Sequence, residues 1–158
     1  MPLITPPYHI TLVVADVEAA KEDLGRVLGL SWGKTQNRRV TTDSPARGVK
    51  EIVVCYAYSL NGPPYLELVQ QVPDSIFAEL GLHHIGIWCS DFVEESARLE
   101  AEGWPRECVN VTPEGEWMSG LFHRGPSGLR VEVIDIANSG PRLVKYLNGG
   151  DYRPQNVG

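Results

Sequence analysis

The sequence has no apolar run that approaches the roughly 20 residues a helix needs to span a bilayer. Its first ten residues, MPLITPPYHI, lack the basic start and the long apolar stretch of a secretory signal. Both absences argue against a membrane partner and against export. We therefore expect a soluble protein in the cytoplasm.

Cysteine is scarce, and basic residues form no cluster. The three cysteines, Cys55, Cys89 and Cys108, are widely spaced and include no C-x-x-C pair, which argues against a disulfide framework or a thiolate zinc site. The 14 basic residues are outnumbered by 20 acidic ones, giving a net charge of −6, so we expect no nucleic-acid partner. The remaining composition, 42% hydrophobic and 22% charged, is typical of a globular protein. A length of 158 residues fits one domain or two small fused modules.

The clearest positive feature is an internal repeat. The segment YHITLVVADVEAAKEDLGRVLGL (8–30) resembles HHIGIWCSDFVEESARLEAEGW (83–104). Each begins with an aromatic residue and a histidine, continues as a short apolar strand, and then has an aspartate before a helical stretch. His9 aligns with His84, and Asp16 aligns with Asp91 at the predicted N-cap of each helix.

A second pair of segments aligns without a gap, EIVVCYAYSLNGPPYLELV (51–69) with EWMSGLFHRGPSGLRVEVI (116–134). Both indicate a strand, a Gly/Pro turn and another strand. Glu67 aligns with Glu132, and Glu51 aligns with Glu116. The sequence therefore predicts two βαβββ modules at 1–70 and 83–137, joined by a linker at 71–82 with a short helix. Residues 138–158 are predicted to form a C-terminal extension that contains a helix.

Alternation along the strands places the repeated histidines and glutamates on one face. Side chains of a strand point to opposite faces in turn. His9, Glu67, His84 and Glu132 are each flanked by apolar residues that must pack under the helices. We therefore expect these four side chains on the inner, concave face of a curved sheet.

Taken singly, a strand histidine is more often a hydrogen-bonded core residue, and a strand glutamate is more often solvated. The repeat changes this weighting, because two histidines and two glutamates recur at matched positions on the predicted inner face. A buried carboxylate is costly unless it is paired or binds a metal. Imidazole and carboxylate together suit zinc, iron, nickel, cobalt or manganese. We predict that one divalent ion is bound by His9, Glu67, His84 and Glu132.

The motifs YHITLVV, YLELV, LHHIGIW and GLRVEVID, in this order and spacing, resemble the vicinal oxygen chelate superfamily. That group includes glyoxalase I, methylmalonyl-CoA epimerase, extradiol dioxygenases and bleomycin-resistance proteins. The resemblance covers about residues 8–136 and implies an α+β fold, in which paired βαβββ modules form a cup-shaped mixed sheet around a metal, with helices outside. It also implies a small-molecule substrate, such as an acyl-CoA or another carbonyl compound, and a homodimer.

Within this superfamily, GVKEIVV (48–54) looks most like the epimerase branch, where a strand glutamate acts as a proton-transfer base beside the metal. That role would fall on Glu51, which shares a strand phase with Val49, Val53 and Cys55, and this phase is predicted to face inward. Glu116 is the repeat partner of Glu51 and a candidate second base. The alternative is that both glutamates are solvent-exposed residues at the ends of strands and have no catalytic role.

Four functions remain open. The first is a metal-dependent isomerase or epimerase that abstracts a proton next to a metal-bound carbonyl. The second is a glyoxalase I-like lyase, since glutamate at the position of Glu67 is usual there. The third is an extradiol dioxygenase, although such iron sites typically use two histidines and one carboxylate. The fourth is a resistance protein that binds a small molecule without chemistry.

Overall fold

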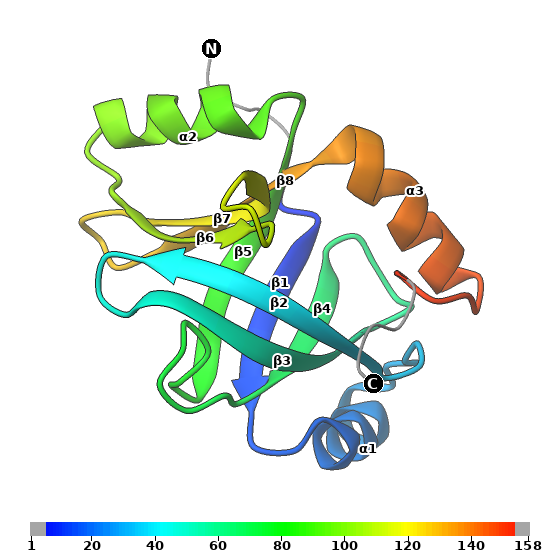
Figure 1. Cartoon of the computed structure of the whole chain (residues 1–158). Helices are drawn as coiled ribbons and strands as arrows, with labels where there is room; N and C mark the ends of the chain where they lie inside the picture. Colours follow the sequence, from blue (N-terminus) through cyan, green and yellow to red (C-terminus); the bar gives the residue numbers. More distant parts are fainter. Residues whose placement is uncertain (1–5, 154–158) are drawn as a thin grey trace.

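The computed structural model describes residues 6–153, which form a barrel of strands with helices outside (Figure 1). The first half of the chain contains β1 (His9–Val14), α1 (Val17–Leu28), β2 (Gln36–Ser44), β3 (Gly48–Tyr58) and β4 (Tyr65–Gln70). The second half contains β5 (Gly81–Cys89), α2 (Phe92–Ala101), β6 (Arg106–Val111), β7 (Trp117–Arg124) and β8 (Arg130–Asp135). Helix α3 (Ile136–Leu147) follows directly.

The two halves have the same topology. The closed barrel has the order β1-β4-β3-β2-β6-β7-β8-β5, so each half contributes four neighbouring strands. Strand β1 is parallel to β4, as β5 is to β8, and the remaining pairs are antiparallel. The halves meet at two seams, between β1 and β5 and between β2 and β6. The α+β fold of two βαβββ units, with helices outside a curved mixed sheet, is therefore confirmed.

Apolar side chains on the outer face of the barrel explain where the helices pack. Helix α1 covers a cluster around Val17, Ala57 and Leu68, and α2 covers a cluster around Leu99 and Val133. Figure 1 shows these two helices on opposite sides of the barrel. The Asp16 side chain accepts a hydrogen bond from a backbone N–H of the first turn of α1, and that of Asp91 does so in α2, as predicted for N-caps.

The barrel interior contains a separate, aromatic-rich core. It includes Val54, Tyr56, Tyr58 and Phe122, all buried. Helix α3 is held against this core by Tyr146, whose hydroxyl donates to the Lys34 carbonyl and accepts from the Tyr58 N–H. The C-terminal extension therefore forms part of the wall of the interior.

Two predictions for the connecting segments have different outcomes. The segment 71–80 forms turns and contains no helix, which corrects the short helix expected there, and β5 begins at Gly81. A helix does occur in the C-terminal extension, and it begins at Ile136 because Asp135 caps it at the end of β8. The module boundaries themselves stay predictions. Within residues 6–153, no helix has the length and apolar character required to cross a membrane.

Candidate metal centre

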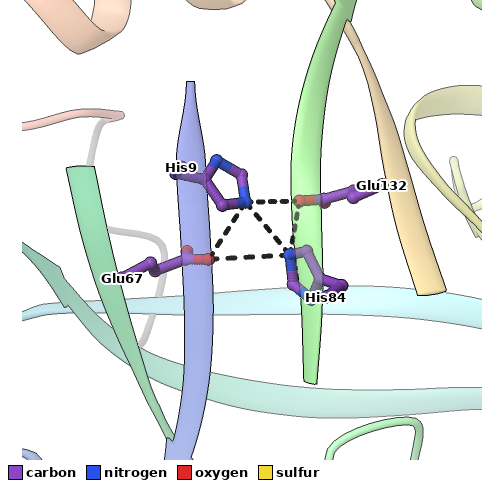
Figure 2. Close-up of side chains that lie close together, drawn as sticks. All are labelled: His9, Glu67, His84 and Glu132. Carbon is purple, nitrogen blue, oxygen red and sulfur yellow. Dashed lines mark hydrogen bonds and ion pairs between the residues drawn. The ribbon is translucent and has the colours of Figure 1, made fainter. Parts of the chain in front are cut away.

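Four side chains from four strands converge inside the barrel (Figure 2). His9 comes from β1, Glu67 from β4, His84 from β5 and Glu132 from β8. One nitrogen or oxygen of each residue lies within 4.8 Å of the corresponding atoms of the other three. Three of the residues are buried and Glu132 is half-buried. The structure thus brings together the four residues that the repeat singled out.

The distances between these atoms fit a shared cation. His84 Nε2 lies 3.0 Å from both His9 Nε2 and Glu132 Oε2. His9 Nε2 lies 3.4 Å from Glu132 Oε2 and 3.5 Å from Glu67 Oε2, and the distance from His84 Nε2 to Glu67 Oε2 is 3.8 Å. Ligands about 2.1 Å from a metal lie about 3.4 Å apart in a tetrahedron and about 3.0 Å apart at adjacent octahedral positions. The donor set and spacing therefore suit a divalent ion.

The electrostatics of the cluster also favour a cation. Burial by itself would raise the pKa of Glu132, but hydrogen bonds from His84 and His9 outweigh it and hold that pKa well below its usual range. Glu132 is therefore a carboxylate at neutral pH. Glu67, the second carboxyl of the cluster, is 8% exposed. Two acidic side chains so close together in a barrel interior need positive charge nearby.

Two small neighbours shape the site. Gly86 lies opposite His9 across the β1–β5 seam, and a Cβ atom there would overlap the His9 ring. The Thr11 hydroxyl donates to Glu67 Oε2 at 2.5 Å and lies 3.0 Å from His84 Nε2. Sequence reasoning assigned no role to Thr11, although its place two residues after His9 on the same strand face was a usable signal.

His83 orients the ring of His84. Its Nε2 donates to the Ile76 carbonyl at 2.6 Å, because a carbonyl oxygen can only accept. Burial is the main cause that lowers the pKa of His83 to about 3, so its ring is neutral and its Nδ1 is an acceptor. The Nδ1–H of His84 therefore donates to His83 across 2.8 Å. This commits Nδ1 of His84 as a donor to His83, so that Nε2, which contacts Glu132, is the nitrogen that would bind a metal in place of its proton.

A β-bulge explains why the sequence did not reveal this contact. Regular alternation would turn His83 away from His84. In β5, however, His84 pairs with Thr11 of β1, and Leu82 pairs with the next residue, Leu12. His83 is therefore an extra residue with no partner on β1. Such a bulge locally redirects side chains. His83 is consequently only 6% exposed and packs beside Phe77 and Phe122.

The two predicted proton-transfer residues do not reach the centre. Glu51 lies on the outer face of β3, is exposed, and pairs with Arg39 at 2.7 Å. The inner face of β3 carries Ile52 and Val54 instead, so the strand phase predicted for Glu51 is wrong. Glu116 lies in the exposed turn between β6 and β7, where its backbone N–H donates to the Thr112 hydroxyl. These placements correct the expectation that either carboxylate faces the cup.

A cavity of about 90 Å³ adjoins the cluster. Three of the cluster residues line it, Glu67, His84 and Glu132, together with the polar residues Tyr56, Tyr58, Tyr152, Arg38 and Arg153. Burial raises the pKa of Tyr152 to about 12, so its hydroxyl is a neutral hydrogen-bond donor at pH 7. Both carboxylates of the centre therefore face a confined, partly polar space.

A comparison with protein families places most of the chain in a known superfamily. The family model of the glyoxalase/bleomycin resistance protein/dioxygenase superfamily matches residues 8–122, which is most of the chain. No curated protein sequence has significant similarity to the chain.

Several solved structures share the fold. A hypothetical protein from Bacillus halodurans is 19% identical, with a TM-score of 0.56 over 82% of this chain and 93% of its own. A variant of Streptomyces coelicolor methylmalonyl-CoA epimerase, in complex with 2-nitronate-propionyl-CoA, is also 19% identical, with a TM-score of 0.55 over 83% and 96%. Methylmalonyl-CoA epimerase from Mycobacterium tuberculosis is 15% identical, with a TM-score of 0.56 over 85% and 92%. At these identities the likeness concerns the fold.

Proposed function

Because the chain belongs to the glyoxalase/bleomycin resistance protein/dioxygenase superfamily, we propose that it is a divalent-metal-dependent isomerase or epimerase that moves a proton next to a substrate carbonyl. The observation that carries this proposal is the cluster of His9, Glu67, His84 and Glu132 beside an accessible cavity. The epimerases among the structural neighbours support it at the level of fold.

The four residues would hold one ion of zinc, iron, nickel, cobalt or manganese. When bound, such an ion polarises a carbonyl oxygen and makes the adjacent C–H more acidic. The imidazoles of His9 and His84 supply neutral ligands, and the two carboxylates balance the charge of a divalent ion. The cavity admits the reactive end of a substrate to the side of the cluster where Glu67 and Glu132 lie.

Glu67 is our candidate for the proton-transfer base. Its Oε2 atom lies 3.5 and 3.8 Å from the two histidine nitrogens, whereas that of Glu132 lies 3.4 and 3.0 Å from them. The histidines therefore hold Glu67 less closely, and Thr11 donates a hydrogen bond to the same oxygen. In this proposal the Glu67 carboxylate takes the proton from carbon and later returns it. Return to the same carbon exchanges or inverts that centre, and return to its neighbour isomerises the substrate.

Deuterium incorporation from heavy water tests this function. We expect the metal-loaded protein to exchange the acidic C–H of methylmalonyl-CoA or of another acyl-CoA or 2-hydroxy-ketone. Glu67→Gln keeps an oxygen ligand but removes the base, so exchange per bound ion should fall about 10²-fold or more. Glu22→Gln, on the exposed face of α1, is the control. Full exchange in Glu67→Gln combined with loss in Glu51→Gln would refute the assignment.

A glyoxalase I-like lyase is the second candidate, favoured by the presence of a carboxylate at Glu67 beside the other three ligands. It would use the same base on the thiol adduct of a 2-oxoaldehyde. Conversion of the glutathione adduct of methylglyoxal, without deuterium exchange into acyl-CoA substrates, would favour the lyase. Tight binding with neither reaction would favour a resistance-type binding protein.

A further inference from the structure

Three arginines lie at the cavity beside the metal centre or in the depression that adjoins it. Arg38 lies on β2, Arg142 on α3, and Arg153 follows α3. Arg38 and Arg153 line the cavity that contains Glu67, His84 and Glu132. All three arginines line an adjoining depression. The site therefore combines one arginine of the first half with two from the C-terminal extension.

The fold holds these arginines in place. The Tyr152 N–H donates to Gln36 Oε1 at 3.1 Å, and its ring stacks on Tyr58 with centroids 5.9 Å apart. These contacts anchor Tyr152, and therefore the backbone of the next residue, Arg153, close to β2. Strand β2 carries both Gln36 and Arg38. Arg142 lies on the same helix as Tyr146, which is anchored to the barrel by two hydrogen bonds.

The three charges repel one another and are partly removed from water. Burial is the main cause that lowers the pKa of Arg38, and Arg142 adds to the effect. Burial, with the charges of Arg38 and Arg142, lowers the pKa of Arg153 to about 10. Both guanidinium groups still carry a full charge at pH 7. Within residues 6–153, no carboxylate forms a salt bridge with half-buried Arg38. A half-buried guanidinium group without an acidic partner is costly unless an anion occupies the cavity beside it.

Charge balance points the same way. A divalent ion would be neutralised by Glu67 and Glu132, because the two histidine ligands are neutral. The cavity then keeps the positive charge of its arginines. We propose that Arg38, Arg142 and Arg153 bind a carboxylate or phosphate group of the substrate, while the substrate carbonyl faces the metal centre. This inference rests on the proposed function and names its substrate class, an anionic carbonyl compound.

The chemistry of arginine suits this role. Its planar guanidinium donates paired hydrogen bonds that match the oxygens of carboxylate and phosphate. The cavity volume of about 90 Å³ admits a small anionic molecule, or the anionic end of a larger one. Arg142 and Arg153 lie beyond residue 122, where the family match ends. Two of the three proposed anion-binding residues therefore come from the C-terminal extension, and the third, Arg38, comes from β2.

Paired probes that differ in one anionic group test the inference. Dihydroxyacetone phosphate is compared with dihydroxyacetone, and levulinate with 2-pentanone, by NMR titration of the protein in saturating Co²⁺. We expect at least one charged probe to bind ten or more times as tightly as its neutral partner. The pair with the larger ratio identifies phosphate or carboxylate as the preferred anion. In Arg38→Gln this ratio should fall toward one.

Matched variants keep the result interpretable. Arg142 is half-buried on the surface of α3, so Arg142→Gln should fold and should also reduce the ratio. Arg26→Gln removes an exposed charge of α1 and should leave the ratio unchanged. A ratio near one in the wild type, or one unaffected by Arg38→Gln and Arg142→Gln, would overturn the inference. A separate Co²⁺ titration tests the metal centre. If the protein bound anions through its arginines but bound no Co²⁺, the proposed function would be rejected and the anion-binding inference would stand.

Discussion

At the scale of single residues, the short chain of contacts from the Ile76 carbonyl through His83 to His84 is the most consequential arrangement outside the four predicted ligands. It commits Nδ1 of His84 as a donor and turns Nε2 toward the other three ligands. His83→Phe keeps an aromatic ring in a pocket that already contains Phe77 and Phe122, but removes the acceptor for His84. We expect metal affinity to fall by roughly 10–100-fold, which isothermal titration calorimetry can measure.

The matched control is a second buried histidine. His123 is fully buried. Its Nδ1–H donates to the Trp104 carbonyl at 2.8 Å, and its Nε2 accepts from the Ser96 hydroxyl at 2.8 Å. Its contacts lie under α2, outside the metal centre. His123→Phe removes buried hydrogen bonds of the same kind, so it should lower stability while metal affinity stays at the wild-type value. An equal loss of affinity in both variants would indicate general destabilisation.

His123 also predicts a pH dependence. Burial, as the main cause, lowers its pKa below the ordinary value of about 6.5. Below that pH the unfolded chain takes up a proton that folded His123 resists, so the unfolded state binds more protons and stability falls as the pH falls. Urea unfolding of the metal-free protein between pH 7.5 and 5 should show a smaller loss in His123→Gln, by at most about 1.4 kcal/mol per pH unit.

At the scale of elements, the inner faces of β1, β4, β5 and β8 were predictable. In each of these strands the residue that follows the ligand is aliphatic. In the structure such residues pack under helices, for example Leu68 and Val133. When one face of a strand is apolar and packs under a helix, the ionisable residue on its other face must point into the barrel. The same rule gave the four candidate ligands.

The rule failed on β3 because both of its phases are apolar. Val49, Val53 and Cys55 lie on one face of the strand, and Ile52 and Val54 lie on the other. Periodicity alone cannot show which of the two faces points inward. The face with Ile52 and Val54 also carries the bulky rings of Tyr56 and Tyr58, which fill the barrel, so that Glu51 lies on the outer face. The bulge at His83 was also beyond sequence reasoning, because its neighbours are Leu82 and His84, and no glycine or proline adjoins it to mark the shift in register.

The seam between β1 and β5 carries a prediction of its own. Gly86 stands where any side chain would meet the His9 ring, so the close approach of these strands requires glycine. Gly86→Ala should push His9 away from the other ligands and weaken metal binding by ten-fold or more. Gly128→Ala, in an exposed turn with open space around it, should leave metal binding unchanged despite backbone strain. Equal metal affinity in Gly86→Ala and the wild type would show that His9 is not a ligand.

At the scale of the whole molecule, the repeat predicted two equivalent halves and a shared site between them. It could not show that the sheet closes into a barrel, because closure depends on the β2–β6 seam, which joins only Thr41–Asp43 to Val109–Val111. Nor could it show that Arg153 lines the cavity or that Arg142 of α3 lines the adjoining depression, since neither arginine has a counterpart in the repeat. Long-range contacts of this kind leave no local pattern in a sequence.

The most direct test of the central claim is the metal content of the protein after exposure to excess divalent ion and removal of the unbound fraction. The account predicts about one tightly bound ion per chain, a lower melting temperature after chelation, and strong loss of the ion in both His84→Ala and Glu132→Ala. A wild-type protein that retains no ion, or variants that retain it fully, would contradict the assignment of His9, Glu67, His84 and Glu132 as a metal centre.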